Sequence, residues 1–330
     1  MQGEDELFDR LRNGDRSALG RAITLVESTR KEDQRTAGAL VERCLSVIAD
    51  SVRVGITGIP GVGKSTLIDA LGEWMIVQGH RVAVLAIDPS SAHGGGSILG
   101  DKTRMDRLSR NEAAFVRPTA TSGNLGGVGR RTREAIVLCE AAGYDRILVE
   151  TVGTGQTELD VDRMTDINLL LLIAGAGDEL QGIKRGIMES ADLIVFTKAE
   201  GETRVRAQAA SQELRGSVSM LPPRPSGRRA ELLLTNATTG DGIAALGERI
   251  ETICASDRSS GYREAKRKDQ AVSWMEQAIT SGLLDDLHRN EQISEIAKEL
   301  RTAVREGRKS PHAAATELLK LFRKGAGPLP

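Results

Sequence analysis

The stretch VGITGIPGVGKSTLIDALG, residues 54–72, passes from an apolar segment through a glycine-rich loop to a helix-forming segment. Within it, residues 58–65 (GIPGVGKS) fit the spacing G-x-x-x-x-G-K-[ST]. Glycines in such a loop let successive backbone N–H groups converge on phosphate oxygens, and the helix that follows adds the positive end of its dipole. The stretch therefore predicts a phosphate-binding loop between a strand at 53–57 and a helix that begins near Lys64.

The loop gives chemical roles to two of its side chains. Lys64 is expected to reach the β- and γ-phosphates of a nucleotide, and the Ser65 hydroxyl is expected to ligate Mg²⁺. A nucleoside triphosphate with Mg²⁺ is therefore the predicted class of ligand. The loop residues expected to bind it are Gly58, Pro60, Gly61, Val62, Gly63, Lys64, Ser65 and Thr66.

Short apolar runs alternate with longer segments of helical periodicity from residue 53 onward. The runs are RVGIT, RVAVLAID, AAFVRP, RILVET, INLLLLIAG, DLIVFTKA and ELLLTNA. Continuous apolar runs of this length are typical of parallel strands buried on both faces, with helices as right-handed crossovers. We therefore expect an α/β fold with a doubly wound, mostly parallel sheet over residues 51–255. Helical extensions are expected at 1–50 and 256–330.

Composition narrows the class of protein. Of the residues, 39% are hydrophobic but only 2% are aromatic, so the core must be mostly aliphatic. A net charge of −1 gives no overall field that favours nucleic acid or a membrane. We interpret the local basic clusters as solvated helix faces; they contain Arg107, Arg110, Arg130, Arg131 and Arg133. Three separated cysteines, an acidic start and no apolar run near the roughly 20 residues of a membrane helix predict a soluble, cytoplasmic protein.

Carboxylates near the ends of predicted strands are candidate metal ligands. Asp88 ends the run RVAVLAID and Glu150 ends RILVE, so both are expected at the sheet edge where open α/β sheets bind ligands. Asp101 lies in the glycine-rich segment GGGSILGDKTRM, which is typical of a switch. Gly153 closely follows Glu150 and can offer its N–H to a γ-phosphate. The predicted metal ligands are Ser65, Asp88, Asp101 and Glu150.

Residues 197–200 (TKAE) are the candidate reader of the nucleotide base. In GTP-binding proteins with such a loop, a strand-end Asn/Thr-Lys-x-Asp accepts hydrogen bonds from two N–H groups of guanine, and the Lys stem packs on the ring. Thr197 and Lys198 fit this pattern, but Glu200 stands in place of Asp. A bidentate site strongly rejects a base that lacks the donors. We therefore expect guanine, while the longer Glu200 leaves open a relaxed site that also accepts ATP.

In its combination of motifs the chain resembles the MeaB/ArgK-like (methylmalonic aciduria type A) family. These are G-protein chaperones of adenosylcobalamin-dependent acyl-CoA mutases. The resemblance covers nearly the whole chain and is strongest in five segments. They are GITGIPGVGKSTLIDALG, AIDPSSAHGGGSILGDKTRM, RPTATSGNLGGVGRRTREA, ILVETVGTGQTE and GAGDELQGIKRGI. Together these segments are far more specific than a phosphate-binding loop alone.

The resemblance implies a GTPase that is slow alone and is accelerated by its partner mutase. Binding of GTP or GDP with Mg²⁺ would gate adenosylcobalamin loading and help to protect or reactivate the mutase. Glu150 would lie near Mg²⁺ and position the attacking water, with Asp88 and Asp101 completing the metal shell. The catalytic residues implied are Lys64, Glu150 and Asp88.

Family members also have an additional switch, matched here by residues 175–186. In it, Asp178, Gln181 and Lys184 would sense the partner mutase. Amphipathic periodicity alone favours C-terminal helices that brace the nucleotide-binding domain, whereas the resemblance implies that these helices form a homodimer interface. A cobalamin adenosyltransferase is a further possible partner.

Three other functions stay open on the sequence alone. A metallochaperone GTPase that inserts nickel would need clustered His or Cys ligands, but the four histidines show no metal-binding spacing. A kinase would need a base beside a substrate hydroxyl and a closing lid, and a nucleotide-dependent adaptor would show negligible turnover. The client mutase also stays open among the methylmalonyl-, isobutyryl-, 2-hydroxyisobutyryl- and ethylmalonyl-CoA enzymes.

Overall fold

The computed structural model describes residues 2–47, 49–88, 105–120, 127–151, 158–174 and 185–325. The chain divides into two compact units, Met1–Ala271 and Val272–Pro330, each described here by itself. The division predicted at residues 50 and 255 stays a prediction. Within the described ranges, no helix combines the length and apolarity needed to cross a membrane.

The first unit is built on a sheet in which every described strand pairing is parallel. Its strands are β1 (Val52–Gly58), β2 (Val82–Asp88), β3 (Ala114–Ala120), β4 (Arg146–Glu150), β5 (Ile167–Ile173), β6 (Leu193–Thr197) and β7 (Glu231–Leu234). They lie in the order β3-β2-β4-β1-β5-β6-β7 in the described part of the chain. The predicted fold class is confirmed, and β1, which leads into the glycine-rich loop, lies at the centre of the sheet.

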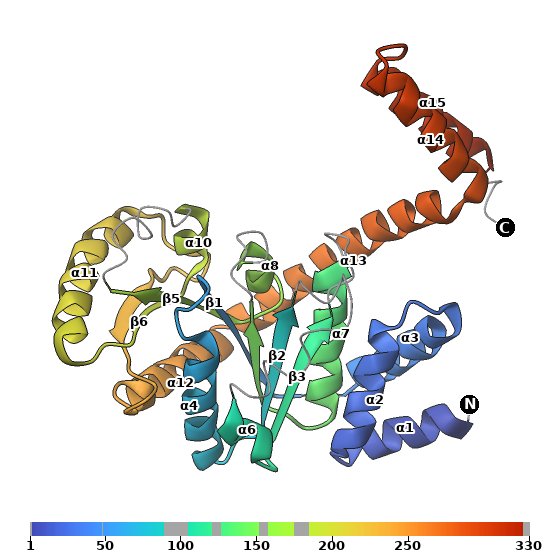
Figure 1. The fold of residues 1–330 in the computed structure, drawn as a ribbon. Coiled ribbons are helices and arrows are strands. Elements are labelled where there is room, and N and C mark those ends of the chain that lie inside the picture. The colour runs from blue at the N-terminus through green and yellow to red at the C-terminus, as the bar shows by residue number, and fades with distance from the viewer. Residues whose placement is uncertain are drawn as a thin grey trace. The chain divides into compact units, whose positions relative to one another are not determined.

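Helices cover both faces of this sheet (Figure 1). Those of the first unit are α1 (Gln2–Arg12), α2 (Arg16–Glu27), α3 (Lys31–Leu45), α4 (Lys64–Val77), α6 (Asp106–Arg110), α7 (Gly127–Ala141), α8 (Glu158–Asp162), α10 (Arg185–Ser190), α11 (Gly201–Met220), α12 (Ile243–Ser259) and the first part of α13 (Tyr262–Arg289). Two layers form because successive strand residues point to opposite faces. In β2, Ala83 and Leu85 join the core completed by α7 and α1–α3, whereas Val82 and Val84 join the core of α4 and α12.

Local sequence explains where helix α2 begins. Asp15 caps α2, because its side chain accepts hydrogen bonds from the backbone N–H groups of Ser17 at 2.8 Å and Ala18 at 3.1 Å. The buried face of α2, with Leu19 and Ile23, then packs on α7. The N-terminal helices are therefore a third layer over α7, not a separate core.

Buried charges hold the first part of α13 against the edge of the sheet where β1 and β5 begin. Arg267 donates to both carboxylate oxygens of Asp166, at 2.8 and 2.6 Å, and the Arg53 backbone N–H donates to the same carboxylate at 2.9 Å. Burial opposes ionisation of Asp166, but the hydrogen bonds and charge of Arg267 outweigh it and hold the pKa of this carboxyl below its ordinary value. The contact ties α13 to β1 and β5 at the opposite end of these strands from the glycine-rich loop.

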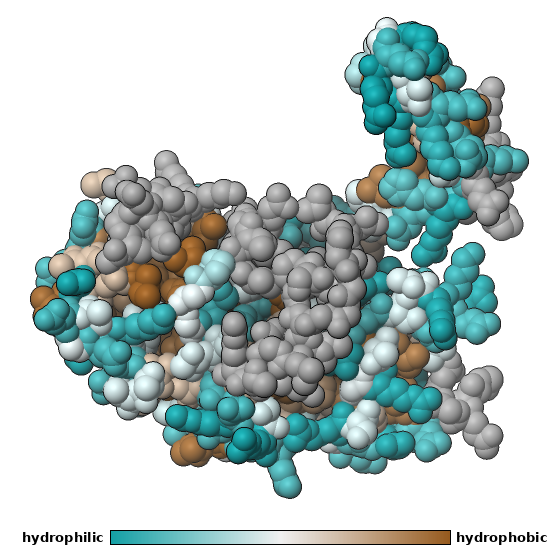
Figure 2. Space-filling model, in the orientation of Figure 1, coloured by the Kyte–Doolittle hydropathy of each residue, from teal (hydrophilic) through white to brown (hydrophobic). Residues whose placement is uncertain are grey.

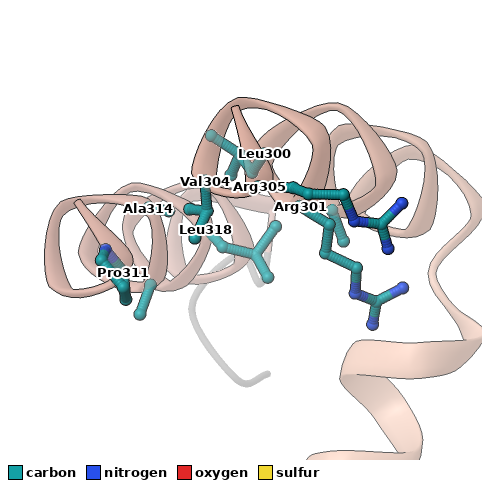
Figure 3. Close-up of a pocket in the computed structure, with 9 residues that line it drawn as sticks. Leu300, Arg301, Val304, Arg305, Pro311, Ala314 and Leu318 are labelled. Carbon is teal, nitrogen blue, oxygen red and sulfur yellow. The ribbon is translucent and has the colours of Figure 1, made fainter. Parts of the chain in front are cut away.

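The second unit contains the remainder of α13, α14 (Glu291–Arg305) and α15 (Pro311–Gly325). Its helices α14 and α15 pack together around a groove of about 430 Å³. Figure 3 shows the groove between the two helices, with Arg301 and Arg305 projecting together from α14. The apolar residues that line it include Leu300, Val304, Pro311, Ala314 and Leu318. Most of the side chains that line this groove within the second unit are apolar.

Candidate nucleotide-binding site

The glycine-rich loop leaves the carboxyl end of β1 and enters α4 at Lys64, as the sequence predicts. Gly58 has φ +150°, and a Cβ there would lie 2.8 Å from the backbone oxygen of Leu171 on β5. Gly63, at the N-cap of α4, has φ +99°, a conformation that side chains with Cβ rarely adopt. The loop therefore requires glycine at both positions, and it exposes the first turn of α4 to a ligand.

Lys64 occupies the inside of this loop. Its side-chain ammonium group donates to the backbone oxygens of Gly58 at 2.8 Å and Ile59 at 3.1 Å, and the residue is only 8% exposed. The charge therefore lies where it can exchange carbonyl partners for phosphate oxygens. Of the other predicted loop residues, Val62 is buried, whereas Pro60, Gly61 and Thr66 are exposed.

Ser65 and Glu150 come together beside the loop. Strands β1 and β4 pair so that Ile56 lies opposite Glu150, which puts the carboxylate next to the start of α4. The Ser65 hydroxyl donates to Glu150 Oε1 at 3.1 Å, and Glu150 is 9% exposed. A hydroxyl and a carboxylate are hard oxygen donors, so this pair fits Mg²⁺.

Asp88 ends β2 at the same edge of the sheet. Ala86 of β2 pairs with Glu150 of β4, so Asp88 lies two residues beyond this pair, toward the carboxyl end of β2. Strand β2 lies beside β4 on the side opposite to β1. The backbone position of Asp88 agrees with the predicted metal edge. The remaining predicted residues, namely Asp101, Gly153, Asp178, Gln181 and Lys184, lie outside the described residues.

Thr197 and Lys198 are tied to the loop directly. The Thr197 hydroxyl, at the end of β6, donates to the backbone oxygen of Val62 at 2.6 Å. The Lys198 ammonium group donates to the backbone oxygen of Gly61 at 2.8 Å, and its Cε lies 3.7 Å from where a Cβ on Gly63 would be. Lys198 also has φ +54°, which is uncommon for a residue other than glycine. The candidate base reader and the glycine-rich loop are therefore in direct contact.

Glu200 precedes α11 and has an exposed side chain. Its Oε2 accepts a hydrogen bond from the amide Nδ2 of Asn236 at 2.8 Å. Asn236 follows β7 and was not among the predicted site residues. The rule that places polar residues at strand ends could have found it, because the run ELLLTNA ends beside this edge.

The chain is similar to known proteins over most of its length. The family model described as Methylmalonyl Co-A mutase-associated GTPase MeaB matches residues 19–292. A protein named as a probable GTPase of Mycobacterium tuberculosis is 48% identical over 317 residues, covering 96% of this chain and 94% of its own. The mitochondrial methylmalonic aciduria type A homolog of Mus musculus is 43% identical over 329 residues, covering 97% of this chain and 79% of its own.

A solved structure extends these similarities to three dimensions. A crystal structure titled LAO/AO transport system kinase is 33% identical to this chain, with a TM-score of 0.77, and the match covers 98% of both chains. The likeness therefore includes the helical extensions as well as the sheet. It agrees with the family resemblance that the five motif segments predict.

Proposed function

The chain belongs to the MeaB family of mutase-associated GTPases, and from this premise we propose that it is a GTP-binding and GTP-hydrolysing chaperone. Its client is an adenosylcobalamin-dependent acyl-CoA mutase of the methylmalonyl-CoA mutase type. GTP binding and hydrolysis gate the loading of adenosylcobalamin and help to protect or reactivate that mutase.

One observation carries the nucleotide part of this proposal. Two hydrogen bonds, from Thr197 to Val62 and from Lys198 to Gly61, join the candidate base reader to the phosphate-binding loop. A single nucleotide can therefore place its phosphates on the loop and its base against residues 197–200. The Lys198 stem beside Gly63 is placed to cover the ring, and the Glu200 carboxylate supplies acceptors for guanine N–H groups.

Different residues of the proposed site bind the phosphates, hold Mg²⁺ and orient the attacking water. Lys64 binds the β- and γ-phosphates through its buried ammonium group, and the N–H groups of the first turn of α4 bind phosphate oxygens. Ser65, Glu150 and Asp88 would hold Mg²⁺, which when bound neutralises charge on the phosphate oxygens. Glu150 also orients the attacking water, so its loss should slow turnover more than binding.

We place the partner-sensing function on residues 175–186, with Asp178, Gln181 and Lys184, and the γ-phosphate contact on Gly153. The family match supports a mutase as the partner, since the matching family is described as associated with methylmalonyl-CoA mutase. A switch of this kind adopts one arrangement with the γ-phosphate and relaxes after hydrolysis. A cobalamin adenosyltransferase is the proposed donor of the cofactor.

The second unit is the proposed homodimer interface. On the part of α13 that belongs to it, five large apolar residues are each between 53% and 58% exposed: Val272, Met275, Ile279, Leu283 and Leu284. Their spacing of three or four residues aligns most of them along one helix face. Hydrophobic patches are visible between the hydrophilic residues of this unit (Figure 2). An exposed apolar stripe of this kind is typical of an association surface.

The experiment that tests this function measures phosphate release from GTP with and without methylmalonyl-CoA mutase. The proposal predicts slow release alone and at least a tenfold acceleration by the mutase, with Glu150→Ala slow in both conditions. Transfer of adenosylcobalamin to the apo-mutase, followed by absorbance, should require GTP binding. Transfer of the γ-phosphate to a protein or small molecule instead of water would favour a kinase and contradict the proposal.

A further inference from the structure

Two side chains of α13 hold the carboxyl end of the short helix α8. The Gln270 amide Nε2 donates to the backbone oxygens of Asp162 at 2.9 Å and Thr165 at 2.8 Å. One turn earlier on α13, the Lys266 ammonium group donates to Asp162 Oδ1 at 2.9 Å and to the backbone oxygen of Asp166 at 3.1 Å. The last carbonyl groups of a helix have no partner within it, so α13 supplies a donor that α8 lacks.

The same end of α8 packs on strand β1. Val161 is fully buried, and a Cβ on Gly55 of β1 would lie 2.2 Å from its Cγ1, so glycine is required there for α8 to approach the strand. Gly55 is followed by Ile56, which pairs with Glu150 of β4, and then by the glycine-rich loop. Because a close-packed interior transmits displacements, a shift of α8 would reach the strand beside Glu150.

Helix α8 also fixes one end of the segment that follows Glu150. At the other end of that segment, the Thr151 N–H donates to the backbone oxygen of Ile56 at 3.1 Å. Helix α8 then begins at Glu158, and residues 152–157 between them lie outside the described residues. The proposed γ-phosphate contact, Gly153, belongs to this segment. The contacts of α13 with α8 therefore set where the segment that carries Gly153 ends.

Stability alone does not account for the Gln270 contact. The orientation that donates to both backbone oxygens leaves Gln270 Oε1 buried, without a hydrogen-bond partner in the described part of the chain. A buried acceptor of this kind costs free energy, which offsets part of what the two hydrogen bonds contribute. The amide therefore adds little to the net stability of the chain, while it fixes the end of α8 in one place.

We propose that Gln270 and Lys266 are positioning residues for GTP hydrolysis. Through them α13 holds α8 against β1, and α8 in turn holds the segment after Glu150 in the arrangement that hydrolyses GTP. This role rests on the proposed function, in which Glu150 orients the attacking water. Loss of the contacts should slow hydrolysis and leave the binding of GDP, which has no γ-phosphate, nearly unchanged.

The test measures single-turnover GTP hydrolysis and, by calorimetry, GDP affinity, both on the full chain with Mg²⁺. Gln270→Met removes both donors to the end of α8 and keeps a side chain of similar length. The hydrolysis rate should fall about 10-fold or more, because a displacement of about 1 Å caused far from the reacting atoms can cost about 100-fold. GDP affinity should stay within about threefold of the unmodified chain, as expected when only the transition state is affected.

Lys266→Met is a second variant, in which Asp162 keeps an ion pair because Arg224 lies 2.7 Å from its carboxylate. Its hydrolysis rate should also fall, by more than about threefold, and Lys266→Arg, which keeps the charge and the donors, should restore the rate. Lys268→Met is the matched control, since this lysine lies on the same helix but is exposed. It should leave both the rate and the GDP affinity unchanged. A thermal melt of each variant checks the fold.

The outcomes separate the role of these residues from the function on which it rests. If the unmodified chain does not hydrolyse GTP, or Glu150→Ala hydrolyses it equally fast, the proposed function fails and this role fails with it. If Glu150→Ala is slow but either Gln270→Met or Lys266→Met keeps the unmodified rate, only the positioning role is overturned. A rate that falls in step with GDP affinity and melting temperature would show a structural role instead. A Lys266→Arg variant as slow as Lys266→Met would also contradict the proposal.

Discussion

Replacing Lys64 with alanine removes an ammonium group from the inside of the phosphate-binding loop. In the structure this group donates to two backbone oxygens, those of Gly58 at 2.8 Å and Ile59 at 3.1 Å. We expect the same donors to turn to oxygens of the β- and γ-phosphates when a nucleotide binds. The substitution therefore removes two hydrogen bonds to charged groups from the complex and two to neutral carbonyls from the free protein.

The size of the effect follows from this difference. Hydrogen bonds to charged groups contribute about 1.5–3 kcal/mol each, and neutral ones about 1 kcal/mol. Subtracting the carbonyl contacts leaves a net loss of roughly 1–4 kcal/mol, which corresponds to about 5- to 1,000-fold weaker GDP binding. The fold should persist, because the loop glycines and β1 do not depend on this side chain.

Isothermal titration with GDP and Mg²⁺ measures the loss, and a thermal melt checks the fold. Lys298→Ala is the control, since this lysine is exposed and pairs with Glu295 on α14. It should bind GDP like the unmodified chain. A Lys64→Ala variant whose GDP affinity lies within about threefold of the control would refute the phosphate contacts assigned to Lys64.

Three further perturbations test other parts of the molecule. Glu150→Ala should bind GTP yet hydrolyse it roughly 100-fold or more slowly, because the carboxylate beside Ser65 is lost; an unchanged single-turnover rate would remove Glu150 from the mechanism. Arg267→Met should lower the free energy of unfolding by about 3–5 kcal/mol near pH 7, since Asp166 keeps a buried charge without its partner. The depressed pKa of Asp166 stabilises the unmodified chain above the ordinary value of 3.8, and this contribution is lost as pH falls further. Denaturant titrations should therefore show that the difference in the free energy of unfolding between the unmodified chain and Arg267→Met becomes smaller below about pH 4. A difference that becomes larger there would contradict the assignment. Leu283→Glu should shift the chain toward monomer in sedimentation velocity, and an unchanged association state would exclude the α13 stripe as the interface.

The sheet was predictable because its strands are buried on both faces. Each of the seven apolar runs corresponds to a strand, from β1 to β7. Burial on both faces removes polar alternation, which leaves continuous runs that cannot be confused with exposed loops. The family resemblance is likewise confirmed, since the MeaB family model matches residues 19–292.

The long helix α13 could not be predicted in full. Apolar residues at helical spacing begin only at Ala271, whereas the helix begins at Tyr262. Its first part is polar and is stabilised by ion pairs to distant residues, such as Arg267 with Asp166 and Lys266 with Asp162. Periodicity detects burial of apolar side chains, so it misses a helix that is held by charges.

The basic cluster near α7 was interpreted too uniformly. Arg107, Arg110 and Arg130 are exposed, as a solvated face predicts, but Arg133 is only 5% exposed. Burial lowers the pKa of its guanidinium from the ordinary value, although nearby Asp160 opposes that shift. A run of like charges gives no sign of which member faces the core.

The site was predictable where its chemistry is local. Lys64, Ser65 and Glu150 were expected from strand-end and loop motifs; the structure has Ser65 donating to Glu150 and Lys64 inside the loop, while their roles toward a nucleotide stay a prediction. The strand-end rule could have selected Asn236 as a polar residue at this edge, but its contact with Glu200 depends on the pairing of β6 with β7. That pairing is a property of the topology, which no local pattern contains.

The measurement that tests the central claim most directly is calorimetric titration of the unmodified chain with GDP and with ADP, each with Mg²⁺. A guanine-reading site built from Thr197, Lys198 and Glu200 should bind GDP at least roughly 100-fold more tightly than ADP. Equal or tighter binding of ADP would contradict the claim that this chain is a guanine-nucleotide switch.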